Sequence, residues 1–384
     1  MEHVVDTVII GAGPAGASCA ITLQKNNYSC LLIDKKSFPR GKTCGGGVTE
    51  KTYELIRELL GGEAESVFCG ESDIVELYMK DSLMTRANVG KKYRFIKREV
   101  FDNALVSEYK RLGGVMLEEC VCKKIEPASK RLTLSNGDTV RYRTLVGADG
   151  AKSAVRRAFG IPEPRQAFCA ECHVPRSAME YDGAVRIYFG IIKKGYAWVF
   201  PSGDEVCIGL GGLAKKDDRF DLVLKEFTRA LGVSAEYETK GAFLPYGEVA
   251  DQSSLPDDTV LIGDAAGFAD PLTGEGLYFA LASGMAAARA AAGGSFKSEY
   301  LAETEQFRRT VEEGAGVQGK LFLPGAMTLV KKLVSGRPGF TSYVFDNIVS
   351  MYNYSYNDLK KLTEDYKKTR RIDRLIFSER RQTW

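Results

Sequence analysis

One segment near the start of the chain restricts its fold more than any other. A short β-branched run at residues 4–10 leads directly into Gly11-Ala12-Gly13-Pro14-Ala15-Gly16, and residues 15–25 then have the composition of a helix. In such a turn the first glycine permits the tight bend, the second lets a pyrophosphate approach the backbone, and the third allows helix and strand to pack closely. The segment therefore predicts an α/β, Rossmann-like domain that binds a dinucleotide.

An acidic residue completes this unit. A second apolar run, Cys30–Ile33, ends at Asp34, which is placed to bind a ribose hydroxyl. The phosphates would lie at the N-terminus of the helix, where free N–H groups and the helix dipole favour negative charge. The predicted cofactor-binding residues of this unit are Gly11, Gly13, Ala15, Gly16, Asp34 and Lys35.

Later segments suit the same cofactor. They are Arg98, Asp149-Gly150, Gly263-Asp264, and Gly274 with Gly276. Asp264 is placed to accept hydrogen bonds from ribityl or ribose hydroxyls. A helix beginning near Gly276 would point its N-terminus at the pyrimidine edge of a flavin, which is negative when the flavin is reduced. Together and in this order, the segments predict FAD bound along its whole length.

A second match to GxGxxG, at residues 314–319, lacks this context. It follows the polar, helix-like residues 307–313 instead of a strand, and no acidic ribose partner comes after it. We interpret it as a break between helices, so we find no second dinucleotide site for NAD(P)H. Whether NAD(P)H or ferredoxin reduces the flavin stays open.

Composition excludes several classes of protein. The 384 residues carry 53 basic and 50 acidic side chains, a net charge of +3 that gives no reason to expect nucleic-acid binding. No stretch approaches the ~18–20 apolar residues that span a bilayer. The chain opens on a strand and shows no signal-peptide pattern, so we expect a mature protein beginning at Met1 in the cytoplasm.

The cysteines predict neither disulfides nor a metal site. There are nine, scattered along the chain. Cys169-Ala170-Glu171-Cys172-His173 has the spacing of covalent haem attachment. It precedes a β-rich stretch in which small cysteines pack well, and FAD already accounts for redox chemistry, so we favour packing.

The pattern of elements predicts a flavin domain that is interrupted in sequence. Residues 1–165 and 255–300 would form the FAD-binding domain, with 115–117 and 132–134 as strands of a small meander. Residues 166–254, rich in short β runs, would form an inserted antiparallel β-sheet domain for substrate and catalysis. Residues 301–384 would form a C-terminal helical region.

Two kinds of motif carry a family resemblance. The flavin segments, with Arg98, Phe101, Asp102 and Leu105 as Arg-x-x-Phe-Asp-x-x-Leu, resemble the para-hydroxybenzoate-hydroxylase-type flavoproteins. Lys42-Thr43-Cys44-Gly45-Gly46-Gly47 and Tyr196-Ala197-Trp198-Val199-Phe200-Pro201, followed by Gly209, are similar to motifs of the geranylgeranyl reductase family. The resemblance runs from residue 4 to about 290, and Thr43 stands where relatives commonly have proline.

The resemblance implies roles for both motifs. The glycine-rich loop would lie beside the isoalloxazine with Cys44 as proton donor or gate, supported by Lys42, Gly45 and Gly46. Lys42 could instead hold the loop or meet the diphosphate of a substrate. Composition alone also fits a flexible surface loop.

The aromatic motif has two readings as well. Alternation on a strand puts Tyr196, Trp198 and Phe200 on one face, and we expect Pro201 to end that strand. The resemblance implies that this face and Pro201 bind substrate, whereas the stripe alone fits a plain core face.

The implied activity is reduction of C=C bonds in polyprenyl chains of lipids or isoprenoids. Reduced FAD would give hydride from N5, with proton delivery near Cys44. The partners would be a prenyl-chain lipid and an electron-donor protein. The alternatives are an FAD-dependent monooxygenase of an aromatic or related small molecule, and a non-catalytic flavin- or lipid-binding protein.

The C-terminal segment adds a membrane hypothesis. Residues 360–381 carry nine basic and four acidic side chains interspersed with apolar ones. Such a stretch can lie on an anionic membrane, which would make the protein peripheral to it. The alternative is a solvated terminal helix packed on the domain.

Overall fold

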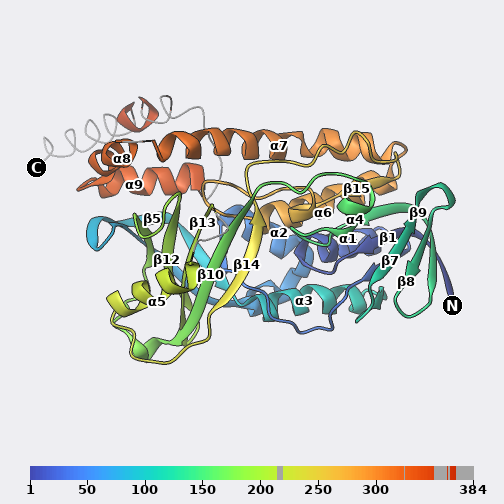
Figure 1. The fold of residues 1–384 in the computed structure, drawn as a ribbon, viewed down its shortest axis with the longest axis horizontal. Helices are drawn as coiled ribbons and strands as arrows, with labels where there is room; N and C mark the ends of the chain where they lie inside the picture. Colours follow the sequence, from blue (N-terminus) through green and yellow to red (C-terminus); the bar gives the residue numbers. More distant parts are fainter. Residues whose placement is uncertain (214–218, 324, 350–360, 362–363, 369–384) are drawn as a thin grey trace, which may run out of the picture.

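The computed structural model describes residues 1–213, 219–323, 325–349, 361 and 364–368. Two sheets stand side by side, and the long helix α7 (Phe296–Leu321) runs along one side of both (Figure 1). The resulting α/β architecture, with a Rossmann-like domain, a second sheet and C-terminal helices, is the predicted one.

The first sheet surrounds the predicted dinucleotide unit. Its strand order is β6-β2-β1-β9-β8-β7, with β15 also pairing with β9. The strands are β1 (Glu2–Ile10), β2 (Cys30–Ile33), β6 (Val115–Leu117), β7 (Cys122–Glu126), β8 (Arg131–Leu134), β9 (Thr139–Gly147) and β15 (Thr259–Leu261). The meander consists of β7, β8 and β9. Residues 115–117 are not part of it, because β6 instead extends the parallel portion beside β2.

Helices cover this sheet and bring its distant segments together. They are α1 (Pro14–Lys25), α2 (Glu50–Leu60), α3 (Arg98–Arg111), α4 (Ala154–Ala158) and α6 (Leu277–Ala292). The small residues of α6 let it approach α1 closely: a Cβ at Gly284 would overlap Ser18 Oγ and the carbonyl oxygen of Ala15. This contact joins the two sequence portions of the flavin domain.

The second sheet draws on more of the chain than residues 166–254. Its order is β14-β10-β13-β12-β11-β4-β5-β3. The strands are β3 (Gly47–Val48), β4 (Phe68–Met79), β5 (Ser82–Ile96), β10 (Gln166–Pro175), β11 (Val185–Phe189), β12 (Gly195–Ser202), β13 (Glu205–Leu213) and β14 (Lys240–Pro245), and α5 (Phe220–Ala230) packs on one face. β11 pairs with β4 in parallel, so the sheet is mixed and not purely antiparallel.

Pro201 does not end its strand. It lies inside β12 opposite Val206 of β13, and the strand continues to Ser202. Pairing with β11 stops at Val199. One side of β12 is therefore open at this position, where a residue without an N–H is tolerated.

Helices cover the β5 end of the second sheet. They are α8 (Ala326–Val334), α9 (Pro338–Val344) and a π-helical turn, η5 (Phe345–Val349). The Asp346 carboxylate accepts hydrogen bonds from the backbone N–H groups of Gly90 (2.9 Å) and Lys91 (3.0 Å) in β5.

The second GxGxxG match is not a break between helices. Residues 314–319 lie inside the continuous helix α7. Across the residues described above, no helix is both long and apolar enough to span a membrane. The predicted membrane-binding stretch, residues 360–381, falls outside the described residues except for 361 and 364–368.

Candidate active site

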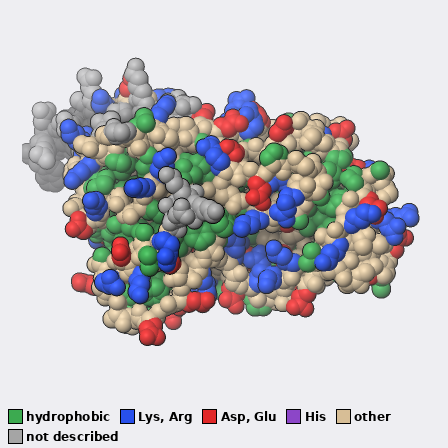
Figure 2. Space-filling view, in the orientation of Figure 1, with side chains coloured by type: hydrophobic (Ala, Val, Ile, Leu, Met, Phe, Trp, Pro, Cys, Tyr) green, Lys and Arg blue, Asp and Glu red, His purple; other side chains and the backbone are tan. Residues whose placement is uncertain are grey.

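A cavity of about 1150 Å³ lies where the two sheets meet. This exceeds the ~300–1,000 Å³ typical of a pocket for one small ligand. Figure 2 shows Lys and Arg side chains gathered around a hollow between the two halves of the molecule. The exposed charged residues that line the cavity are all basic: Lys35, Lys36, Lys42, Lys123, Lys124, Lys152 and Arg157. The cavity mouth therefore attracts anions.

One end of the cavity fits a pyrophosphate. Gly11 has φ +103°, and a Cβ there would meet Ala148 and the Cα of Asp149 at 2.9 Å, so only glycine fits. At Gly13 a Cβ would meet only Arg40, at 3.6 Å. The helix α1 that starts after Gly13 has no side-chain cap, and its first residues line the cavity. Its free N–H groups are suited to phosphate oxygens.

Asp34 lies beside this turn. Its carboxylate accepts hydrogen bonds from the backbone N–H groups of Ala12 (2.7 Å) and Lys36 (2.9 Å). The carboxylate and the neighbouring Lys35 both line the cavity. Gly16 and Gly263 do not line it; they permit close backbone packing, because a Cβ at Gly16 would overlap the Gly11 carbonyl and one at Gly263 would lie 2.9 Å from Ala15.

Arg98 is fixed by a buried carboxylate. Its guanidinium donates two hydrogen bonds to Asp102, at 2.7 and 2.8 Å, and Arg40 lies 3.2 Å from the same carboxylate. Burial lowers the pKa of Arg98, but Asp102 and then Cys44 outweigh this and raise it. Arg98 thus remains a cation on the cavity wall.

Two aspartates offer acceptors to a cofactor. Asp149 accepts from the N–H groups of Ala154 (2.6 Å) and Val155 (3.2 Å), while its buried Oδ1 has no partner among the described residues. Burial raises the pKa of Asp264, against the opposing effects of Lys42 and Arg98. Both line the cavity, as does Gly150, so cofactor hydroxyls can donate to them.

The loop before α6 is held from several sides. Asp270 accepts from the N–H groups of Leu272 (2.8 Å) and Thr273 (3.1 Å). Glu275 accepts from Thr49 Oγ1 (2.8 Å) and Thr52 Oγ1 (2.7 Å). Gly274 and Gly276 line the cavity, and α6 begins after Gly276 without a side-chain cap. A second free helix N-terminus therefore faces the cavity.

A buried lysine supports the same loop. Lys51 Nζ lies 3.7 Å from Glu275 Oε2 and 3.8 Å from the ring centroid of Tyr278. Burial lowers the pKa of Lys51 to about 8, although Glu275 and Asp270 oppose the shift.

The glycine-rich loop and the aromatic strand meet in the cavity. A Cβ at Gly45 would lie 3.1 Å from Trp198 Nε1 and 3.3 Å from the Phe200 ring, so the loop backbone lies directly on these rings. Gly46 has φ +74°, and Ile96 donates to its carbonyl at 3.0 Å. The Tyr196 hydroxyl donates to the carbonyl of Thr273.

The predicted residues of both motifs are largely brought together. Lys42, Cys44, Gly45, Gly46, Tyr196, Trp198 and Phe200 all line the cavity, whereas Pro201 does not. The haem-like spacing is split between the two faces of β10, because Cys169 lines the cavity and Cys172 lies in the core beneath the sheet. The residues described here include no group of side chains that could hold a metal.

Beyond the aromatic strand the cavity becomes an apolar chamber. The second sheet contributes Leu77, Tyr93, Phe95, Val185, Ile187 and Phe189. The C-terminal helices contribute the facing wall, with Leu321, Phe322, Val330, Leu333, Val334, Phe340, Val344, Phe345 and Val349. Sequence reasoning missed this wall, because its apolar residues resemble those of any packed helix.

Sequence reasoning also missed Glu171 and Glu275. Glu171 accepts a hydrogen bond from the Cys44 backbone N–H at 2.7 Å. One signal could have found it: it is the only carboxylate in the apolar run of residues 166–175.

Comparison with known proteins agrees with this geometry. A family model described as an FAD binding domain matches residues 4–176. An uncharacterized protein of Methanosarcina barkeri is 33% identical over 294 residues, covering 74% of this chain and 73% of that protein. The chloroplastic geranylgeranyl diphosphate reductase of Oryza sativa is 26% identical over 334 residues, covering 79% of this chain and 70% of that enzyme. This chain belongs to the geranylgeranyl reductase family of FAD-dependent oxidoreductases.

A solved structure shares the family fold. The geranylgeranyl bacteriochlorophyll reductase-like protein of Thermoplasma acidophilum matches with a TM-score of 0.78 at 20% identity, covering 95% of this chain and 100% of that one. The match to an FAD binding domain, together with the family, makes FAD the cofactor of this chain. The free N-termini of α1 and α6, the close approach at Gly13 and the unpartnered Asp149 oxygen fit it.

Proposed function

We propose that this flavoprotein saturates C=C bonds in polyprenyl chains of the geranylgeranyl type. The observation that carries the proposal is the apolar chamber, which opens from the same cavity as the glycine-rich loop and the flavin-binding segments. An isoprenoid chain offers no hydrogen-bonding group, so a site selects it by shape and apolar contact. The chamber walls supply such contact from both the second sheet and the C-terminal helices.

The reaction needs a hydride for one alkene carbon and a proton for the other. Reduced FAD supplies the hydride when bound. Cys44 holds a thiol at the junction between the flavin-binding segments and the chamber, and we assign it the proton donor. The Arg98 guanidinium lines the same cavity and would offer positive charge to the thiolate left behind.

The remaining residues position the substrate and exclude water. Trp198 and Phe200 are stacked at 6.1 Å and support the loop at Gly45. Lys42 is exposed at the cavity mouth and suits an anionic head group. The basic mouth would likewise attract an anionic electron donor, NAD(P)H or an acidic protein such as ferredoxin.

An anaerobic experiment tests the activity. The protein is reduced with dithionite, a geranylgeranyl lipid is added, and flavin absorbance is followed together with product mass. We expect flavin re-oxidation and a gain of two hydrogens for each bond reduced. The matched control is the fully saturated lipid, which should leave the flavin reduced. A flavin that stays reduced with the unsaturated lipid until oxygen is admitted would contradict the proposal and favour a monooxygenase.

Cys44→Ala tests the proton donor in the same assay. Loss of a positioned acid slows proton transfer by about 10²- to 10⁴-fold. We expect such a loss in the rate of flavin re-oxidation, with FAD content and dithionite reduction unchanged. A variant with the wild-type rate would remove Cys44 from this role.

A further inference from the structure

Glu171 lies in a row of residues that crosses the cavity face of the second sheet. On β10 it pairs with Gly209 of β13, which in turn pairs with Trp198 of β12. A Cβ at Gly209 would overlap the Trp198 ring, so the missing side chain lets the indole lie across the sheet towards Glu171. Glu171 is only 3% exposed and lines the cavity beside the glycine-rich loop.

Only one of the two oxygens of the Glu171 carboxyl group accepts a hydrogen bond from the described residues. Its Oε1 accepts a hydrogen bond from the Cys44 backbone N–H at 2.7 Å. Its Oε2 is buried and has no hydrogen-bond partner among the described residues. A buried carboxylate oxygen without a donor is costly when it is charged, but a protonated carboxyl group carries no such charge.

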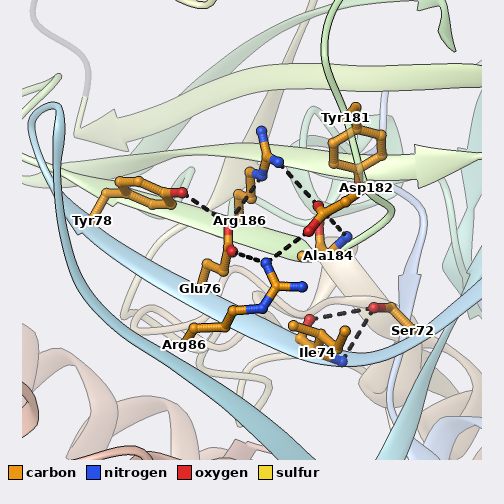
Figure 3. Close-up of polar contacts among 9 residues, drawn as sticks. All are labelled: Ser72, Ile74, Glu76, Tyr78, Arg86, Tyr181, Asp182, Ala184 and Arg186. Carbon is orange, nitrogen blue, oxygen red and sulfur yellow. Dashed lines mark hydrogen bonds and ion pairs between the residues drawn. The ribbon is translucent and has the colours of Figure 1, made fainter. Parts of the chain in front are cut away.

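Another buried glutamate of the second sheet differs from Glu171 because it has two cationic partners. Glu76, also 3% exposed, lies between Arg86 and Arg186 and accepts from the Tyr78 hydroxyl at 2.8 Å (Figure 3). Its neighbour Leu77 lines the cavity, so Glu76 points to the opposite face of the sheet. Glu171 has no such cation within ion-pair distance in the described part of the chain.

The surroundings of Glu171 favour its neutral form. Burial raises its pKa to about 7, while the Cys44 N–H and then Lys42, Arg98 and Lys240 act in the opposite direction. The titratable and charged groups that face it are Lys42 and Cys44 in the loop, Arg98 on α3, Cys169 on β10, Cys207 on β13, and Lys240 on β14, whereas Cys172 lies on the opposite face of β10. The carboxyl group thus carries a proton in mildly acidic solution and exchanges it near neutrality.

We propose that Glu171 holds the proton that restores the Cys44 thiol after each reduction. This rests on the proposed function, in which Cys44 gives its proton to the substrate carbon. The O–H bond at Glu171 then breaks and the S–H bond at Cys44 forms, leaving a carboxylate and a thiol. One bridging water carries the proton, because the carboxyl group's hydrogen bond to Cys44 is to the backbone N–H and not to the thiol. The carboxylate regains its proton from solvent at the cavity mouth, so each reduced bond consumes one hydride and one solvent proton. Glu171 acts through Cys44 and is a positioning residue.

Glu171→Gln tests the proposal, because the amide keeps an oxygen acceptor for the Cys44 N–H but cannot exchange a proton. The wild-type turnover rate should fall as pH rises through about 7, where Glu171 ionises. This falling part of the pH–rate profile, the pH limb, should be absent in the variant. At pH values below the limb, turnover of the variant should be lower than that of the wild type by about 10²-fold, the typical contribution of a positioned acid. Glu76→Gln is the matched control and should retain the limb.

A second readout does not depend on turnover. Infrared spectra of the wild-type holoprotein should contain a protonated-carboxyl band that disappears as pH rises through about 7. Glu171→Gln should lack that band and Glu76→Gln should keep it. If Glu171→Gln does not fold, Glu171→Asp replaces it and should keep both the band and the pH limb, at a lower rate.

The outcomes separate the two proposals. A Glu171→Gln protein with the wild-type rate and pH limb overturns the role of Glu171, and so does a wild-type protein without the titrating band. If no prenyl substrate is reduced by the wild type, the proposed function fails. The infrared band then still shows whether Glu171 holds an exchangeable proton.

Discussion

At the scale of single residues, Glu171 has a consequence for stability that is independent of catalysis. Its pKa rises from 4.5 to about 7 on folding. The folded state therefore holds this proton more tightly than the unfolded state does. Stability from this source is fully present below pH 4.5 and is lost as pH rises through about 7.

Glu171→Gln removes this pH dependence. The variant and the wild type should have similar free energies of unfolding below pH 4.5. Above pH 7 the variant should be more stable by up to about 3 kcal/mol, since each unit of pKa shift is worth about 1.4 kcal/mol. Denaturant titrations below pH 4.5 and above pH 7 measure the difference.

Glu76→Gln is the control and should instead lower the free energy of unfolding on both sides of this pH window, because it leaves two arginines short of a partner. Equal pH profiles for wild type and Glu171→Gln would contradict the assignment.

The predicted residues that lie together most directly are those whose positions depend on the local backbone. Gly11, Gly13 and Asp34 are set by one strand–turn–helix unit, so their spacing alone placed them together. Glu171 and Glu275 could not be found in this way. Their partners, Cys44 and Thr49, come from segments more than a hundred residues away, and no local pattern encodes such a pairing.

At the scale of elements, the contact between α1 and α6 holds the two sequence portions of the flavin domain together. Gly284→Ala should lower stability by about 1–3 kcal/mol, because the added methyl group overlaps Ser18 and the Ala15 carbonyl. FAD retention should fall as well, since Ala15 lines the cavity. Thermal unfolding and the flavin content after gel filtration measure both effects.

Gly316→Ala is the matched control for this substitution. Gly316 lies inside α7, and a Cβ there would meet nothing within 4 Å. Alanine should therefore stabilise the helix by about 0.4–1 kcal/mol. A loss of stability at Gly316 equal to that at Gly284 would show that close packing between α1 and α6 is not the cause.

Helix α7 also shows why the second match to GxGxxG led to a wrong prediction. Residues 314–319 contain three glycines, which suggested a break. Helix α7 continues through them because Val311, Gly314 and Gln318 are buried on one side, and Gln318 donates to the Pro271 carbonyl at 2.8 Å. Tertiary contact overrode local propensity there. The hairpin of β4 and β5 pairs locally, but its place in the second sheet was missed, because β4 joins that sheet by pairing with β11, about a hundred residues later.

At the scale of the whole molecule, chamber length should set substrate length. Val334 on α8 lines the chamber wall. Val334→Trp should lower turnover of geranylgeranyl chains while geranyl chains are still reduced, with FAD content unchanged. Leu323→Trp, at a site 58% exposed and outside the cavity lining, is the control. Equal loss for both chain lengths would mean that this wall does not contact the chain.

The overall architecture was predictable because a strand, a glycine turn and an acidic residue rarely combine without a Rossmann-like domain. The enclosure of the chamber was not. It depends on how α8, α9 and η5 fold back onto β5, and that docking rests on contacts such as Asp346 with Gly90 rather than on any motif.

One wall of the chamber comes from a different part of the chain than the flavin-binding end of the cavity. The FAD-domain match spans residues 4–176, whereas one whole chamber wall comes from residues 321–349. Mutations in that wall can accumulate without disturbing the glycine turn, Asp34 or Arg98. Evolution can therefore change which substrate the chamber accepts while the flavin-binding residues stay the same, and a protein engineer can begin with the same short segment.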